Sequence, residues 1–163
     1  MEEQEECFGD SCRDEEMNLT IDASVFVSAA RSSEKQYPQS YRFPNRVKGA
    51  KIFCPTLVLA ECGAAIARPT GDSLLSGRLV NLIKHFPGMT QVPLDQTLAL
   101  RAAEIAIENR LRGADAVYAA VAEDFDAVLV SWDEEMLERC PESVLAMSPE
   151  KWLENASRTD GRE

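Results

Sequence analysis

The residues best suited to chemistry in this sequence are four acids that stand alone among apolar neighbours: Asp22, Glu61, Asp115 and Asp133. The first three are the only charged residues in the stretches 18–30, 52–67 and 113–122, and the fourth directly follows the apolar run 127–132. An ionised carboxylate is costly to bury alone, so each acid needs a cation, hydrogen-bond donors or a shifted pKa. These acids are therefore the candidate functional groups.

A set of carboxylate oxygens without histidine or cysteine suits a hard divalent cation, and Mg²⁺ or Mn²⁺ is the usual choice for phosphate chemistry. The single histidine, His85, is expected at the surface or at a helix end. Without a metal, four converging carboxylates would repel one another strongly. The four acids therefore predict a site for Mg²⁺ or Mn²⁺.

Each acid also has an ordinary structural interpretation. Asp115 and Asp133 are placed where acids commonly begin helices. Asp22 could shape a turn at a strand end, and Glu61 could pair with Arg68 or another base. The joint occurrence of four isolated acids, more than any one of them, favours the functional interpretation.

Patterns typical of strands and helices alternate along the chain from Asn18 onward. Short apolar or alternating runs predict strands at 18–22, 51–55, 89–93, 127–132 and 143–147. Amphipathic or alanine-rich runs with capping residues predict helices at 23–31, 56–68, 73–85, 96–112 and 114–124, from 133 and from 149. The alternation predicts an α/β fold, a three-layer sandwich with a central parallel sheet flanked by helices.

Such a sheet would bring the four acids together, because sites in open parallel sheets lie outside the carboxyl ends of the strands. Asp22 ends the first expected strand and Asp133 follows the fourth. Asp115 lies in the first turn of its expected helix, and Glu61 lies in a helix that leaves the same edge. Ser24 and Ser131, also near strand ends, could orient these carboxylates, although small hydroxyl residues are ordinary there too.

The formal net charge of −11 argues at first against a nucleic-acid partner, because lysine and arginine contacts supply much of such affinity. Residues 1–16 alone carry −7, which leaves −4 for the rest of the chain. The segment 31–51 contains six basic residues, one acidic residue and three aromatic residues. This composition suits phosphate contacts and base stacking, and a solvated helix and loop explains it equally well.

The chain of 163 residues is long enough for one domain with its own core. We expect a disordered acidic tail at 1–16, the domain at 17–156 and a disordered tail at 157–163. The sequence lacks a membrane-spanning run and a basic, then apolar, signal peptide, so we expect a cytoplasmic protein with no membrane partner. Five cysteines without zinc spacing predict neither a disulfide framework nor a zinc site.

Four segments together resemble the PIN-domain ribonucleases, particularly toxins of the VapC type: TIDASVFVSA, PTLVLAECGAAIAR, LRGADAVYAAVAE and AVLVSWDEEML. The resemblance covers about residues 17–156 and holds in the order and the expected structural context of the segments. It implies a PIN fold, metal ligands at Asp22, Glu61, Asp115 and Asp133, and a supporting hydroxyl at Ser24. Two departures are the acidic tail and the linker 34–51, where Pro38 and Pro44 stand in place of a regular helix.

The resemblance further implies an endoribonuclease that hydrolyses RNA phosphodiester bonds with Mg²⁺ or Mn²⁺, as the toxin of a toxin–antitoxin pair. It implies a homodimer and a cognate antitoxin protein as partners. The composition of the basic segment 31–51 makes Arg42, Arg46 and Lys48 the candidate RNA contacts. The alternative is a non-catalytic PIN-like module that acts through dimer and partner contacts. Phosphoryl transfer through an aspartyl intermediate is disfavoured, because Asp22-Ala23-Ser24 lacks the second acid of a D-x-D signature.

Overall fold

The computed structural model describes residues 17–160, and its centre is a single parallel sheet with the strand order β3-β2-β1-β4-β5. The strands are β1 (Asn18–Ile21), β2 (Lys51–Pro55), β3 (Met89–Val92), β4 (Val128–Val130) and β5 (Ala146–Met147). The strand order reverses direction at β1, so a crevice opens between the carboxyl ends of β1 and β4. The predicted α/β fold with a central parallel sheet is confirmed.

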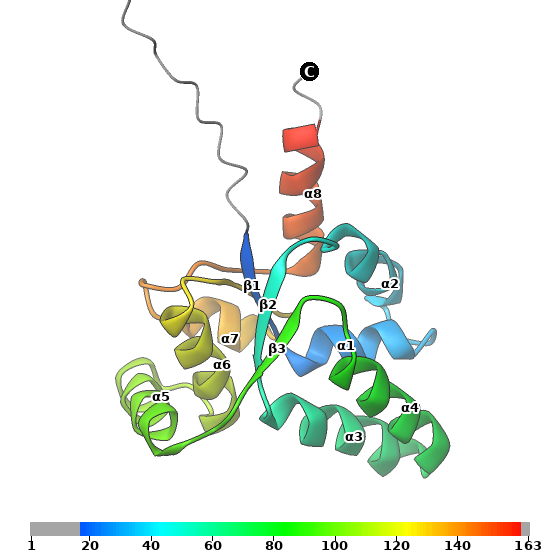
Figure 1. Ribbon diagram of the computed structural model, residues 1–163, viewed down its shortest axis with the longest axis horizontal. Coiled ribbons are helices and arrows are strands. Elements are labelled where there is room, and N and C mark those ends of the chain that lie inside the picture. The colour runs from blue at the N-terminus through cyan, green and yellow to red at the C-terminus, as the bar shows by residue number, and fades with distance from the viewer. Residues whose placement is uncertain (1–16, 161–163) are drawn as a thin grey trace, which may run out of the picture.

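Helices cover both faces of this sheet (Figure 1). They are α1 (Ala23–Ala30), α2 (Tyr37–Arg46), α3 (Leu57–Thr70), α4 (Ser73–Lys84), α5 (Gln96–Asn109), α6 (Gly113–Asp124), α7 (Glu134–Arg139) and α8 (Pro149–Asp160). In Figure 1, α5, α6 and α7 lie on one side of the sheet, and α1, α2, α3 and α4 lie on the other. The three-layer sandwich is therefore as predicted.

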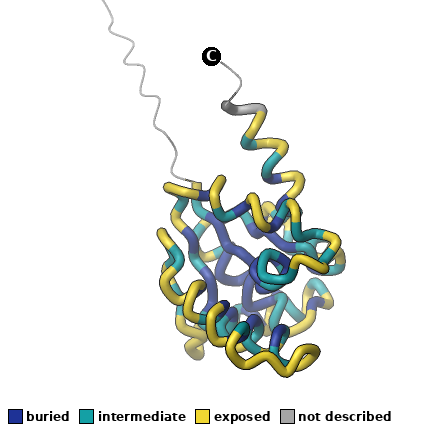
Figure 2. The backbone as a smooth tube through the Cα atoms, turned by 90° about the vertical axis from the view of Figure 1, so that its right-hand side faces the viewer, coloured by how far each residue is buried: buried dark blue, intermediate teal, exposed yellow. Residues whose placement is uncertain are grey.

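The core lies where the sheet meets its covering helices, as the buried backbone in Figure 2 shows. Leu19 and Ile21 on β1 and Leu129 on β4 are fully buried. Helix α6 is buried from Ala116 to Ala122, because it lies between the sheet and α5. The rings of Phe53 and Phe125 stack at 4.1 Å between centroids and join this layer to β2.

Aspartates begin four of the helices. Asp22, Asp72, Asp95 and Asp133 are N-cap residues whose side chains accept a hydrogen bond from a backbone N–H of the first turn. These bonds satisfy donors that a helix start leaves without partners. Asp133 therefore has the helix-start role considered above in addition to any chemical one. Asp22, considered above as a turn residue, also caps a helix, and the N-cap of α6 is Arg112 and not Asp115.

Two helices differ from the sequence-based expectation because prolines are accommodated in them. Helix α3 continues through Pro69 to Thr70 and ends at Gly71, which has a φ of +66°. Pro38 lies in the first turn of α2 and Pro44 lies in its last turn, so the linker 34–51 contains a regular helix after all. A proline costs little in a first turn, where its missing N–H has no helical partner, whereas Pro44 and Pro69 each remove one hydrogen-bond donor from the end of a helix.

The last elements also differ in length from the prediction. β4 and β5 are shorter than expected, and Ser131 and Trp132 leave the sheet to begin the turn into α7. Helix α8 extends to Asp160, beyond the predicted start of a tail at 157, because no helix-breaking residue precedes Gly161.

The predicted tail at 1–16 lies outside the described residues. None of the helices in the described range has the length and hydrophobicity needed to cross a bilayer.

Candidate active site

Four carboxylates line one pocket at the carboxyl edge of the sheet. Asp22 follows β1, Asp133 follows the end of β4, Glu61 lies on α3, and Asp115 lies in the first turn of α6. All four line a pocket of about 820 Å³. Segments far apart in the sequence thus bring the four predicted acids to a shared cavity.

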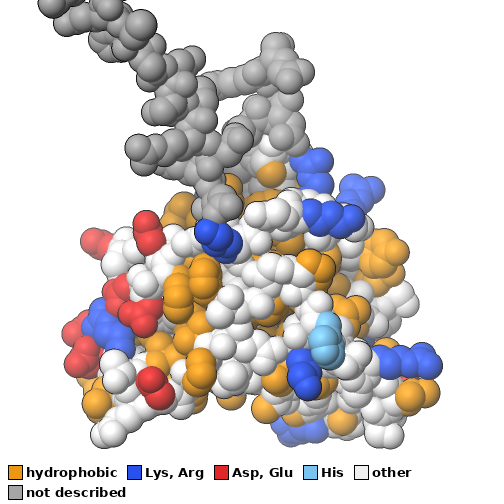
Figure 3. Space-filling model, viewed as in Figure 1, with side chains coloured by type: hydrophobic (Ala, Val, Ile, Leu, Met, Phe, Trp, Pro, Cys, Tyr) orange, Lys and Arg blue, Asp and Glu red, His pale blue; other side chains and the backbone are white. Residues whose placement is uncertain are grey.

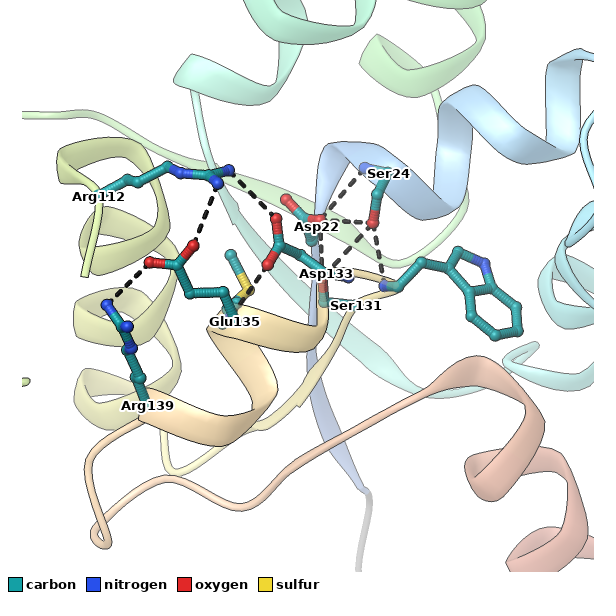
Figure 4. A network of polar contacts seen from close by, with 9 residues as sticks. Asp22, Ser24, Arg112, Ser131, Asp133, Glu135 and Arg139 are labelled. Carbon is teal, nitrogen blue, oxygen red and sulfur yellow. Dashed lines mark hydrogen bonds and ion pairs between the residues drawn. The ribbon is translucent and has the colours of Figure 1, made fainter. Parts of the chain in front are cut away.

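Asp22 is the most enclosed of these acids, with 7% of its surface exposed. Its Oδ2 accepts hydrogen bonds from the hydroxyls of Ser24 at 2.5 Å and Ser131 at 2.8 Å. Burial raises the pKa of Asp22, and the bonds from the two serines oppose that rise by favouring the carboxylate. Both supporting serines named from the sequence therefore hold Asp22 in one orientation (Figure 4).

The turn after β4 is tied to the same hydroxyls. Ser131 Oγ accepts from the backbone N–H of Asp133 at 2.9 Å, and Ser24 Oγ accepts from that of Trp132 at 3.1 Å. The indole Nε1 of Trp132 donates in turn to Ser40 on α2 at 2.7 Å. The two serines thus join α1 to the turn that carries Asp133, and Trp132 extends this link to α2.

Glu61 is held by a residue that the sequence analysis did not identify. The hydroxyl of Tyr118 on α6, which is fully buried, donates to Glu61 Oε2 at 2.6 Å. Burial raises the pKa of Glu61, the Tyr118 hydroxyl lowers it, and the charge of Asp22 raises it again. The alternative pairing of Glu61 with Arg68 does not occur among the ion pairs of residues 17–160.

Asp115 has the least compensated carboxylate of the four. Its Oδ2 is buried without a hydrogen-bond partner in the structure. Burial and the negative charges of Asp133 and Asp22 raise the pKa of Asp115 to about 6, although Arg112 opposes this rise. An acid with a buried, unpartnered oxygen beside other acids is suited to bind a cation.

The donor set fits a hard divalent cation. It consists of carboxylate oxygens. The charge of Asp22 raises the pKa of Glu61, and the neighbouring acids raise the pKa of Asp115, so a positive charge in the pocket would offset this repulsion. Within residues 17–160, no three histidine, cysteine or acidic side chains stand close enough together to share one ion as they are placed. An ion in this pocket would therefore keep part of its water shell, as Mg²⁺ commonly does in proteins.

Two arginines, Arg68 and Arg112, also line the pocket. The sequence analysis considered Arg68 only as an ion-pair partner of Glu61 and did not name Arg112. Arg68 follows Glu61 by seven positions on α3, a spacing that returns to the same helix face and could have marked it. Arg112 precedes Asp115 by three positions, immediately before α6. Its guanidinium pairs with Asp133 and Glu135 (Figure 4).

The three basic residues named as RNA contacts lie outside this pocket. Arg42 lines a shallow pocket between α2 and α8, Lys48 lines an apolar groove, and Arg46 is at the end of α2. On the face shown in Figure 3, basic side chains gather on the side of α2 and α4, and acidic ones on the side of α5 and α6. A role of these three residues in binding RNA stays a prediction.

The fold has many solved counterparts, whereas no curated protein sequence matches the chain significantly. Toxin VapC20 from Mycobacterium tuberculosis superposes with a TM-score of 0.65 at 15% identity, covering 78% of this chain and 98% of its own. PAE2754 from Pyrobaculum aerophilum has a TM-score of 0.61 at 22% identity and coverages of 87% and 90%. A toxin–antitoxin complex from Klebsiella pneumoniae has a TM-score of 0.56 at 13% identity and coverages of 80% and 97%.

At these identities the structural matches establish the fold alone. The sequence itself matches the model of the PIN domain family over residues 19–141. This range covers most of the chain and contains all four acids of the pocket and both serines that hold Asp22. The chain therefore belongs to the PIN domain family.

Proposed function

We propose that this protein is a Mg²⁺- or Mn²⁺-dependent endoribonuclease and the toxin of a toxin–antitoxin pair. The observation that carries the proposal is the pocket lined by Asp22, Glu61, Asp115 and Asp133, in which Asp115 has a buried oxygen without a partner. The proposed substrate is RNA, because VapC20, a structural counterpart, is described as a toxin that cleaves the sarcin–ricin loop. The proposed reaction is hydrolysis of an RNA phosphodiester bond.

Each residue of the pocket has a role in this reaction. The four acids would hold the ion directly or through its retained water, and the ion when bound polarises the phosphate and lowers the pKa of water. Ser24 and Ser131 fix the Asp22 carboxylate by donating to its Oδ2, and Tyr118 fixes Glu61 in the same way. Such outer hydrogen bonds keep ligands oriented, so the site is organised before the ion arrives.

The proposal is tested by cleavage of a mixed pool of structured RNA with Mg²⁺, with Mn²⁺ or with EDTA. Asp22→Asn is expected to lower cleavage at least about 100-fold, because a ligand charge is lost. Asparagine caps helices as well as aspartate does, so the fold should persist. Asp124→Asn, at the exposed end of α6, is the matched control and should leave the rate unchanged.

Two results would contradict the proposal. They are the absence of cleavage by the parent protein on every RNA and the absence of Mn²⁺ binding in calorimetry. Together they would favour the non-catalytic module.

We propose an antitoxin helix as the occupant of a groove of about 600 Å³ between α1, α2 and α4. Apolar side chains such as Phe26, Leu79 and Phe86 line the groove, which suits the apolar face of an amphipathic helix. A counterpart from Klebsiella pneumoniae was solved as a toxin–antitoxin complex. The test measures, by calorimetry, binding of the protein that a neighbouring reading frame encodes. Leu82→Glu, in the groove, should weaken this binding at least about tenfold. Leu145→Glu, at an exposed position outside the groove, should leave binding unchanged. Equal effects of the two substitutions would exclude the groove as the antitoxin site.

We further propose a homodimer through α5. Leu100 and Ile107 lie seven positions apart on one face of this helix, with 60% and 79% of their surfaces exposed. Exposed apolar stripes of this kind mark association surfaces. Light scattering should give about twice the 18.0 kDa chain mass for the parent and the chain mass for Ile107→Glu. Leu74→Glu on α4 is the control, and a monomeric parent would contradict the proposal.

A further inference from the structure

Arg112 is a cation at the edge of an acidic pocket. Its side chain is 65% exposed, and it lines the same pocket as the four acids. Nη1 lies 3.5 Å from Asp133 Oδ2, and Nη2 lies 3.1 Å from Glu135 Oε2 (Figure 4). Arg112 thus already places a positive charge where the proposed function requires an ion.

The two contacts of Arg112 are unequal. The distance to Asp133 is at the limit of a hydrogen bond, whereas the contact with Glu135 is shorter. Glu135 is itself held by Arg139 at 2.9 Å, and Arg139 also donates to the carbonyl of Arg110. Glu135 therefore anchors the guanidinium, and the contact with Asp133 is the one that can be released at small cost.

Asp133 can exchange partners without losing its place. Its Oδ1 caps α7 by accepting from the backbone N–H of Met136 at 2.9 Å, so the residue stays fixed by one oxygen. The other oxygen, Oδ2, faces Arg112. A divalent ion bound in the pocket would compete for this oxygen with a larger charge.

We propose that Arg112 is a substrate-binding residue that changes partners when the ion binds. In the ion-free protein it neutralises Asp133, and in the loaded protein it contacts a phosphate of the RNA strand at the mouth of the pocket. A guanidinium suits this role because its planar donors match phosphate oxygens in a bidentate contact. The inference rests on the proposed nuclease function and adds a specific residue for recognition of the strand.

A purely structural role for Arg112 is the competing explanation, since Arg112 also links the start of α6 to α7. Loss of a purely structural link would leave ion and RNA binding unchanged, and because exposed ion pairs contribute little to stability, the variants should stay folded. Arg139 offers the matched control. It pairs with the same Glu135 on α7 but does not line the pocket.

The test compares the parent with Arg112→Ala, Arg112→Lys and Arg139→Ala by two binding measurements. Calorimetry with Mn²⁺ alone should show about threefold to tenfold tighter binding for Arg112→Ala, because a competing cation is gone. Fluorescence anisotropy with a short labelled RNA in Ca²⁺ should show about tenfold weaker RNA binding by Arg112→Ala. The slope of log affinity against log salt concentration should fall by about one, as expected for the loss of one phosphate contact. A gel must show that the RNA stays intact.

Arg112→Lys should keep the parent's Mn²⁺ affinity, and its RNA affinity should lie between those of the parent and Arg112→Ala. Arg139→Ala should match the parent in both Mn²⁺ affinity and RNA affinity. Equal RNA affinity for Arg112→Ala and Arg139→Ala would overturn the proposal and leave a structural link. Weaker Mn²⁺ binding by Arg112→Ala would also overturn it, because Arg112 would then help to form the ion site. Failure of the parent to bind Mn²⁺ or to cleave RNA would instead count against the nuclease function itself.

Discussion

Asp115→Asn is expected to make the ion-free protein more stable at about pH 7 while lowering RNA cleavage at least about 100-fold. The carboxylate of Asp115 has a buried, unpartnered oxygen and is surrounded by Asp22, Glu61 and Asp133. Asparagine removes one of these repelling charges. It also removes a proposed ligand, so Mn²⁺ should no longer raise the melting temperature as it does in the parent.

The same substitution should change how stability depends on pH. The pKa of Asp115 is raised to about 6 in the folded protein, above its ordinary value of 3.8. The folded state therefore binds a proton more tightly than the unfolded state, so this group makes the fold more stable as the pH falls through 6. In EDTA, the melting temperature of the parent should rise between about pH 7 and pH 5, and that of Asp115→Asn should rise less.

Thermal melts followed by circular dichroism, with EDTA or with Mn²⁺, measure both effects. Asp124→Asn at the exposed end of α6 is the control and should behave as the parent does. A lower melting temperature for Asp115→Asn in EDTA at pH 7 would contradict the electrostatic explanation. Retained Mn²⁺ stabilisation would show that Asp115 is not a ligand.

Tyr118→Phe is expected to weaken Mn²⁺ binding by about 10- to 100-fold, with a loss of about 1 kcal/mol in the free energy of unfolding. The ring stays in the core, and only the hydroxyl that donates to Glu61 Oε2 at 2.6 Å is removed. That hydroxyl lowers the pKa of Glu61, so its removal leaves a carboxylate that is harder to ionise and free to rotate.

Calorimetry with Mn²⁺ and chemical denaturation separate the two quantities for Tyr118→Phe. Tyr118→Ala should instead destabilise the fold by about 3–5 kcal/mol, because it leaves a cavity under α6. Tyr41→Phe, on an exposed ring of α2, is the control for loss of a tyrosine hydroxyl. Parent-like Mn²⁺ affinity in Tyr118→Phe would mean that Glu61 does not need this hydrogen bond to bind the ion.

Local patterns were enough to predict most of the fold. The alternation of strands and helices and the aspartates at helix starts depend on neighbouring residues, so they can be read along the chain. The elements that differed did so for reasons of position in the fold. Pro44 and Pro69 lie in the last turns of α2 and α3, so neither stops its helix at the residue before it, and β4 ends at Val130, before Ser131, whose hydroxyl donates to Asp22.

The sequence by itself determined which acids are candidates, because an isolated carboxylate in an apolar stretch is conspicuous wherever the chain places it. The order of the strands then brought Asp22 and Asp133 to neighbouring strand ends, as parallel sheets generally do. Only the tertiary structure decided the partners: Tyr118 lies 57 positions from Glu61, and Arg112 lies 21 positions from Asp133. Such pairs depend on how helices pack across the sheet, and packing distances leave no periodic trace in a single sequence.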